Sequence, residues 1–274
     1  MASERTIGPD KEWALPSFRR IWESRELLLA LTLRDVQIRY KQSLLGIGWA
    51  AVQPLLTMVV FSLIFGRVAK LPSDGLPYPV FTMVAILPWQ FFQKSLTQGS
   101  ISLVTLGGMM SKVYFPRLLA PLSSVLSGLI DFGIAFVILL GMMAWFGIVP
   151  GIGVLAVPAL IALVILVSLS ISLVLSGINV RYRDVQHTLP FLAQIWMYLT
   201  PVVYPLSMIP EQYRALYMLN PMVGVVEGFR WSLLGRPFSA TVLELGVSAG
   251  VIAVLLVFSL LYFNRFEKSY VDAL

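Results

Sequence analysis

The chain has no cysteine and a single histidine, His187, among its 274 residues. Without thiolates it cannot form disulfides, iron–sulfur clusters or thiolate metal sites, and one imidazole cannot build a histidine metal cluster. We therefore predict no metal site and no cofactor bound by this chain.

The sequence motifs of nucleotide binding and hydrolysis are also missing. No Gly-Lys dipeptide occurs, so the phosphate-binding P-loop, which ends in Gly-Lys followed by Ser or Thr, is absent. The zinc motif His-Glu-x-x-His and the Gly-x-Gly-x-x-Gly turn are absent as well. Asp131 and Glu227 could serve as a carboxylate pair, but they lie far apart in the sequence and at different predicted depths. We predict no catalytic residue and do not expect an enzyme.

Charge is scarce. Only 12% of the residues are charged and 58% are hydrophobic, whereas soluble domains carry roughly 25% charged residues. A helix needs about 20 predominantly apolar residues to cross a bilayer, because its backbone polar groups must be satisfied internally. The expected fold is an all-α polytopic membrane protein with six transmembrane helices, near residues 44–66, 79–106, 118–147, 152–178, 189–209 and 240–263.

Lysine and arginine are distributed unevenly between the two predicted sides of the membrane. Most of the 20 basic residues lie in the first forty residues or in connections on the same side. The positive-inside rule therefore places both termini in the cytoplasm. These residues gather at one membrane face instead of forming a patch the size of a nucleic-acid groove, so we expect anionic lipid headgroups, and no nucleic acid, as partners.

We expect two parts, a cytoplasmic head at 1–43 and a transmembrane domain at 44–274. The head is too charged, and its apolar run starts too late, for a signal peptide. Within it, apolar residues at helical spacing oppose a polar face, which predicts an amphipathic helix at the membrane interface. The apolar face comprises Leu29, Leu33, Val36 and Tyr40, and the polar face Arg34, Gln37 and Lys41. The helix could be a plain lipid anchor or could dock a partner protein.

Two connections stand out. In the predicted cytoplasmic segment 107–117, paired glycines can break the helix and Pro116 can start the next one. The segment is either a basic, aromatic knob that inserts into another protein or a simple interfacial anchor. The segment 207–237 is too interrupted by polar groups for a span. We interpret it as a re-entrant hairpin of two short helices that closes a pore on the outer side, which requires burial in protein.

Two charged residues fall inside predicted spans. Lys94 lies in the second span and Asp131 in the third. A cation at the centre of a lone helix costs about 2.5–3.5 kcal/mol on insertion scales, so Lys94 needs a partner, for which Asp131 is the obvious choice. The pair could neutralise itself within the bundle or line a solute path. The aromatic residues inside the spans also allow two interpretations: they could pack in the core or face lipid, or they could line a conduit for sugars.

Several stretches of the sequence resemble a known family. The entry to the first span resembles permease subunits of type-two ATP-binding-cassette exporters, and most closely their polysaccharide branch, which exports O-antigen, capsule and teichoic acid. The stretch is Arg34-Asp35-Val36-Gln37-Ile38-Arg39-Tyr40-Lys41-Gln42-Ser43-Leu44-Leu45-Gly46-Ile47-Gly48-Trp49, followed by Gln53-Pro54-Leu55. Further matches are Asn179-Val180-Arg181-Tyr182-Arg183-Asp184-Val185, Tyr198-Leu199-Thr200-Pro201-Val202-Val203-Tyr204-Pro205 and Asn220-Pro221.

This resemblance implies an architecture and a set of partners. The chain would form a homodimer in the bacterial cytoplasmic membrane, with a conduit along the twofold axis for a lipid-linked glycan. Two copies of a separate P-loop ATPase, which carry ATP and Mg, would supply the energy. A drug or small-lipid exporter of the same superfamily, and a stand-alone channel or membrane enzyme, remain as alternatives.

The resemblance also implies roles for individual residues. Contacts with the ATPase fall to Arg34, Asp35, Arg39 and Tyr40, and the coupling knob to Lys112, Tyr114, Phe115 and Arg117. The aromatic conduit lining comprises Trp49, Trp89, Phe92, Trp196 and Tyr198. The outer gate comprises Glu227 and Arg230. An anionic linkage in the substrate could be drawn by Arg39 or Lys41.

Overall fold

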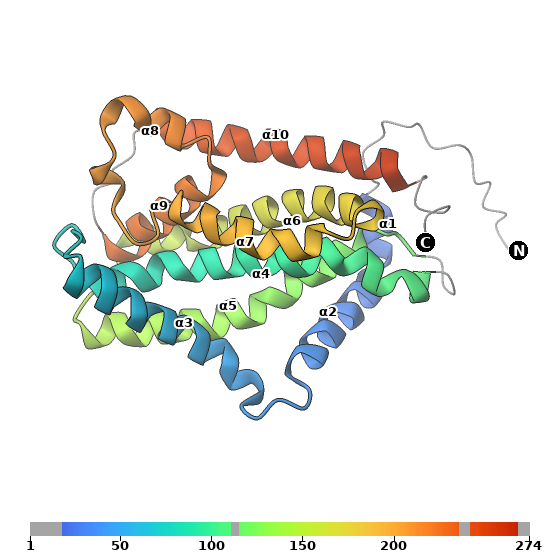
Figure 1. Ribbon diagram of the computed structural model, residues 1–274, viewed down its shortest axis with the longest axis horizontal. Helices are drawn as coiled ribbons and strands as arrows, with labels where there is room; N and C mark the ends of the chain where they lie inside the picture. The colour runs from blue at the N-terminus through green and yellow to red at the C-terminus, as the bar shows by residue number, and fades with distance from the viewer. Residues whose placement is uncertain (1–17, 111–114, 236–241, 268–274) are drawn as a thin grey trace, which may run out of the picture.

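The computed structural model describes residues 18–110, 115–235 and 242–267, and within these ranges the chain is helical with no β-strand (Figure 1). The α-helices are α1 (Phe18–Glu23), α2 (Arg25–Tyr40), α3 (Trp49–Phe61), α4 (Tyr78–Met110), α5 (Leu119–Trp145), α6 (Val157–Arg181), α7 (Val185–Tyr198), α8 (Glu211–Tyr217), α9 (Pro221–Leu234) and α10 (Val242–Glu267). The short 3-10 helices are η1 (Gly46–Gly48), η3 (Ile152–Ala156) and η4 (Leu206–Met208), and η2 (Ser62–Val68) is a π-helix that continues α3.

Four helical segments in the described part of the chain are long and apolar enough to cross a membrane: Gly46–Val68, Leu119–Trp145, Ile152–Arg181 and Gly246–Arg265. They coincide with four of the predicted spans, those at 44–66, 118–147, 152–178 and 240–263. The prediction of an all-α polytopic membrane protein is therefore confirmed. The total of six spans stays a prediction, because the other two segments are a long polar helix and a short one.

The long polar helix is α4. At 33 residues it is easily long enough to cross a bilayer, but its sequence includes Gln90, Lys94 and Gln98. The prediction that Gly107 and Gly108 break it is wrong, because α4 continues through both. A helical glycine costs only about 1 kcal/mol relative to alanine. Leu103 and Leu106 bury their side chains on the same stretch, and this packing outweighs that cost.

The short helix is α7. Its 14 residues span about 21 Å at 1.5 Å per residue, less than the hydrocarbon thickness of about 30 Å. The predicted span 189–209 is therefore wrong in its end point, since the helix stops at Tyr198. Pro201 and Pro205 follow directly, and neither can donate a backbone hydrogen bond to a continuing helix.

The core lies around α4, which packs chiefly against α5 and α6, while α10 covers α6. Small residues allow these helices to approach closely, as is common between helices in membranes. A Cβ added at Gly99 of α4 would lie 2.5 Å from Ser172 Oγ of α6, and one added at Gly228 of α9 would lie 2.5 Å from Leu160 Cδ2. Close helix contact therefore depends on the absence of these side chains.

The predicted outer hairpin contains two short helices, α8 and α9, as expected. Every residue of α9 except Trp231 is buried, and the helix packs against α4, α6 and α10. Figure 1 shows α8 and the start of α4 at one end of the molecule, and α1 and the C-terminal end of α10 at the other. The first and last described helices, α1 and α10, therefore reach the same end of the bundle.

Candidate functional site

The interface helix α2 is fastened to the bundle by its polar residues. Leu31, Asp35 and Arg39 recur every four residues and so share one face, which turns toward α5, the main neighbour of α2. Leu29 and Leu33, from the predicted apolar face, are exposed instead. Exposed leucines at a membrane boundary suit contact with lipid. The helix was correctly predicted. The face that it buries was not, because that face is set by the polar partners on α4 and α5.

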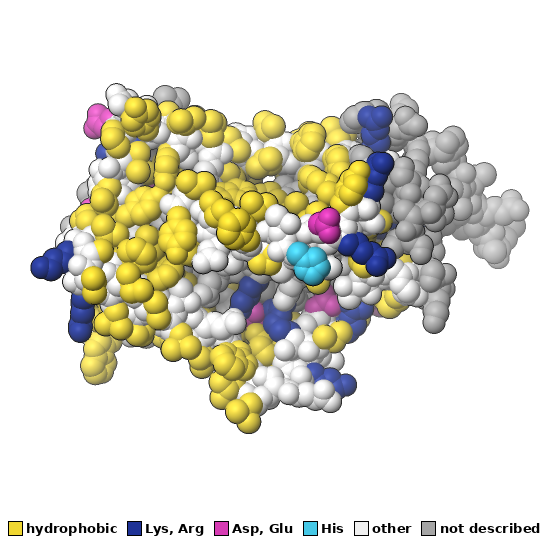
Figure 2. All heavy atoms as spheres, viewed as in Figure 1, with side chains coloured by type: hydrophobic (Ala, Val, Ile, Leu, Met, Phe, Trp, Pro, Cys, Tyr) yellow, Lys and Arg dark blue, Asp and Glu magenta, His cyan; other side chains and the backbone are white. Residues whose placement is uncertain are grey.

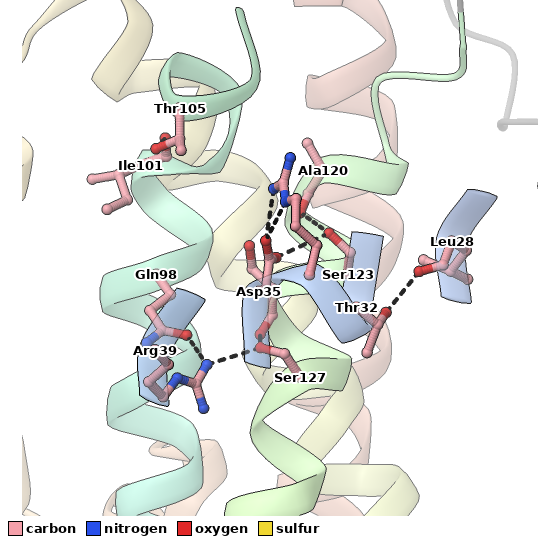
Figure 3. Close-up of polar contacts among 12 residues, drawn as sticks. Leu28, Thr32, Asp35, Arg39, Gln98, Ile101, Thr105, Ala120, Ser123 and Ser127 are labelled. Atoms are coloured by element: carbon pink, nitrogen blue, oxygen red, sulfur yellow. Dashed lines mark hydrogen bonds and ion pairs between the residues drawn. The ribbon is translucent and has the colours of Figure 1, made fainter. Parts of the chain in front are cut away.

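Arg39 is the centre of this attachment. Its Nη1 donates to Asp131 Oδ2 at 2.6 Å, and the two side chains are only 15% and 7% exposed. Figure 3 shows its other amino group reaching Ser127 Oγ of α5, at 2.9 Å, and the Gln98 amide oxygen of α4. One guanidinium therefore joins α2 to two helices of the bundle, through the fork geometry that distinguishes arginine from lysine.

Asp131 receives a second donor from α2, the hydroxyl of Tyr40, which binds Oδ1. Burial raises the pKa of Tyr40 to about 12, and the hydrogen bond to Asp131 acts in the same direction. The hydroxyl therefore stays protonated, and can donate, at any physiological pH.

Lys94 completes the cluster. Its Nζ lies 3.5 Å from Asp131 Oδ2, so the predicted pairing is confirmed, although Arg39 is the closer cation and was missed as a partner. A lone carboxylate in an apolar span signals that some cation must reach it, but not which one. Figure 2 shows basic and acidic side chains in a recess between the α2–α3 corner and the rest of the bundle.

A smaller contact fastens α2 closer to its middle. Arg34 Nη2 lies 2.6 Å from Asp35 Oδ1, and Ser123 Oγ of α5 donates to Asp35 Oδ2 at 3.4 Å. Figure 3 shows Asp35 beside Ser123, one helical turn before Ser127. The inner face of α2 thus lies along two successive turns of α5.

The residues predicted to contact an ATPase therefore fall into two groups. Arg39 and Tyr40 are turned toward α4 and α5, whereas Arg34 keeps 33% of its side chain exposed. In the predicted knob, Phe115 is buried in the core and Arg117 is partly exposed, while Lys112 and Tyr114 lie outside the described residues. Their coupling role stays a prediction.

The five predicted conduit aromatics do not lie together. Trp89 and Phe92 are fully buried and pack against each other with ring centroids 5.4 Å apart, and Phe92 meets Trp196 edge-on at 5.2 Å. These three join α4 to α7 as a packed cluster. Trp49 and Tyr198 are 41% and 47% exposed, so they alone of the five present a large part of their rings at the surface of the single chain.

Asn220 connects the aromatic cluster to the hairpin. Its Oδ1 accepts from the backbone N–H of Met222, which caps α9, and from Trp196 Nε1 at 3.0 Å. Its Nδ2 donates to Thr200 Oγ1 at 2.9 Å. The sequence pattern Asn220-Pro221 marks a helix start, but its link to α7 becomes evident only in the structure.

The predicted outer-gate residues form a buried ion pair on α9. Arg230 Nη1 lies 2.7 Å from Glu227 Oε1, and both side chains are less than a tenth exposed. The guanidinium also donates to the carbonyl oxygens of Val202, at 2.9 Å, and Tyr204, at 3.3 Å, and stacks over the Phe81 ring at 3.8 Å. Arg230 thus holds the segment after α7 against α9 and α4.

Four apolar helices long enough to cross a membrane, the helix α2 held against the bundle by polar contacts, and the buried helix α9 define a polytopic membrane protein. Residues 26–234 match the family model described as ABC-2 type transporter. The chain therefore belongs to the ABC-2 type transporter family.

Named relatives cover most of the chain. It is 33% identical over 215 residues to the O-antigen export system permease protein RfbA of Myxococcus xanthus, covering 77% of this chain and 82% of that protein. It is 26% identical over 250 residues to an RfbA of Klebsiella pneumoniae, covering 91% and 95%. The polysialic acid transport protein KpsM of Escherichia coli is 25% identical over 203 residues, covering 72% and 77%.

Proposed function

We propose that this chain is the membrane permease of an ATP-driven exporter that moves a lipid-linked polysaccharide out across the bacterial cytoplasmic membrane. The observation that carries the proposal is the family match over residues 26–234. Relatives named for O-antigen export and polysialic acid transport support the choice of a polysaccharide over a drug or a small lipid.

The energy would come from two copies of a separate P-loop ATPase that bind ATP and Mg. The lack of any Gly-Lys dipeptide in the sequence supports a separate subunit. Both termini would lie in the cytoplasm, which agrees with the position of α1 and the end of α10 at one end of the bundle. Arg34 of α2, held by its ion pair with Asp35, would receive the ATPase together with the 107–117 connection.

Two copies of the chain would enclose the conduit. Trp49 and Tyr198 are the aromatic residues best placed to line it, because both rings are exposed in the single chain. Sugar rings present apolar C–H faces that pack on aromatic rings, and such a lining would let a polymer slide. The cluster of Trp89, Phe92 and Trp196 would support the lining from behind, and Glu227 with Arg230 would hold the outer hairpin as a gate.

The test is reconstitution of this chain in proteoliposomes with its P-loop ATPase. We expect ATP-dependent translocation of a purified lipid-linked glycan, and none of a small hydrophobic dye. An ATPase whose P-loop lysine is replaced provides the matched control and should abolish export. Translocation of the dye instead of the glycan would favour a small-molecule exporter. Glycan flux without any ATPase would overturn the proposal in favour of a stand-alone channel.

A further inference from the structure

The attachment of α2 depends on one unusual residue, Asp131. It is the only charged residue in the sequence of α5 (Leu119–Trp145), one of the most apolar segments of the chain. A charge in such a span is costly and is retained where it pairs with another group or serves a function. Both carboxylate oxygens of Asp131 bind the last turn of α2, through Arg39 and Tyr40.

The chain path after this turn explains what the contact adds. Helix α2 ends at Tyr40, and the next helical segment begins only at Gly46. Gln42, between them, has a left-handed φ of 60°, so the backbone turns sharply there. A displacement of α2 would reach α3 only through this non-helical connection, whereas the bonds to Asp131 and Gln98 reach α5 and α4 directly.

We propose that Asp131 is a positioning residue that locks the interface helix α2 to α4 and α5, so that these three helices move as one body when the ATPase moves. The inference rests on the proposed function, because the displacement to be transmitted is that of the ATPase. It assigns the coupling path to side chains inside the bundle, in addition to the cytoplasmic connection at 107–117.

The chemistry of the pair favours this role over simple stabilisation. A buried ion pair stabilises a fold no better than well-packed apolar residues of similar volume. Its advantage is directional: the guanidinium fork engages acceptors on α4 and α5 at fixed angles. Apolar contacts at the same place would allow the helices to slide past each other.

The first experiment separates coupling from folding. In proteoliposomes containing the ATPase, we would measure glycan exported per ATP hydrolysed for the double variant Arg39→Met/Asp131→Leu. This variant removes the Arg39–Asp131 pair as a whole and leaves Lys94, whose side chain is 28% exposed, as the remaining charge of the cluster. We expect it to insert and to keep most of its thermal stability. We expect ATP hydrolysis to continue while export per ATP falls roughly tenfold or more, since misplacement of about 1 Å can have large effects on coupled steps.

Single variants serve as controls. Asp131→Glu retains the carboxylate and should recover much of the export per ATP. Ser124→Ala, a buried change in the same helix, should match the unchanged protein. Wild-type export per ATP in the double variant would overturn the inference. If the unchanged protein shows no ATP-dependent export, the proposed function fails first.

A second experiment needs no change to the cluster. Because the chain lacks cysteine, Gln37→Cys on α2 and Gly133→Cys on α5 introduce two exposed thiols for spin labels. We expect the distance between the labels to be the same with and without ATP. A change approaching one helical turn, about 5.4 Å, would show that α2 slides on α5 and would overturn the inference even if the double variant failed to fold.

Discussion

The buried pair of Glu227 and Arg230 predicts an unusual stability pattern. Glu227→Gln leaves the guanidinium of Arg230 buried without a counter-charge, and Arg230→Met leaves the carboxylate of Glu227 in the same position. Combining the two changes, as in Glu227→Gln/Arg230→Met, leaves no isolated charge. We therefore expect the double variant to lose less stability than the sum of the losses of the two single variants.

The contacts set the magnitude. Removing one partner of a buried ion pair costs about 3–5 kcal/mol. Arg230→Met is the more severe single change, because the carbonyl oxygens of Val202 and Tyr204 also lose their donor, at about 1–3 kcal/mol for each group left unsatisfied. In the double variant that second loss remains, while the cost of the isolated charge disappears. Because the cost of the isolated charge enters both single variants and is absent from the double, the interaction energy between the two sites should be at least about 3 kcal/mol, at the upper end of measured couplings.

Thermal unfolding in detergent, followed by tryptophan fluorescence, provides the assay. With roughly 2–4 °C per kcal/mol for a chain of this size class, each single variant should melt at least about 6 °C below the unchanged protein. The double variant should melt well above the value that the two single shifts predict together. Single shifts below about 2 °C, or strict additivity, would refute the idea that these charges depend on each other.

Three further predictions follow from individual contacts. Gly99→Val should lower the free energy of unfolding by about 1–3 kcal/mol, because its Cβ would collide with Ser172. The control Gly133→Val has open space around its Cβ and should lie within about 0.5 kcal/mol of the unchanged protein. Equal losses in the two variants would contradict the close-packing argument. Asn220→Ala should cost about 1 kcal/mol for the lost helix cap and should shift the fluorescence of Trp196. Asn220→Asp should retain the cap and the Trp196 fluorescence. An unchanged spectrum in Asn220→Ala would count against the contact between Asn220 and Trp196. The raised pKa of Tyr40 stabilises the protein below pH 10, and this contribution is lost as the pH rises to about 12. The melting temperature should therefore fall more steeply with rising pH in the unchanged protein than in Tyr40→Phe. Parallel curves would argue against the pKa shift.

Much of the fold could be predicted from hydropathy. The lipid core imposes a minimum length and an apolar composition on any spanning helix, so the four strongly apolar segments were recognisable. The outer hairpin was also recognisable, because its polar residues exclude a span while its length admits two short helices. The ends of α4 and α7 were less predictable, since packing of Leu103 and Leu106 overrides two glycines in one case and two prolines stop the other.

The contacts of the site were harder to predict. The pattern of α2 has two faces, and the general rule assigns the apolar face to the protein or the lipid without choosing between them. Here the neighbours of α2 offer Asp131, Ser127 and Gln98, so a different face, with Leu31, Asp35 and Arg39, turns inward. Gln37 and Lys41 of the predicted polar face stay exposed. The sequence favours Lys94 as the partner of Asp131 because both lie in predicted spans. Nothing in the sequence indicates that Arg39, which lies outside the spans, comes closer.

The Arg39–Asp131 contact also bears on how the protein is made. Arg39 precedes Asp131 by 92 positions, so during synthesis α2 leaves the ribosome well before α5 enters the bilayer. Its guanidinium can wait at the membrane surface and neutralise the carboxylate as α5 inserts. Lys94 precedes Asp131 by only 37 positions, so it leaves the ribosome much closer in time to its partner. Helix α2 is thus available as an assembly aid for α5, and removing α2 should delay insertion of α5 more than that of α6.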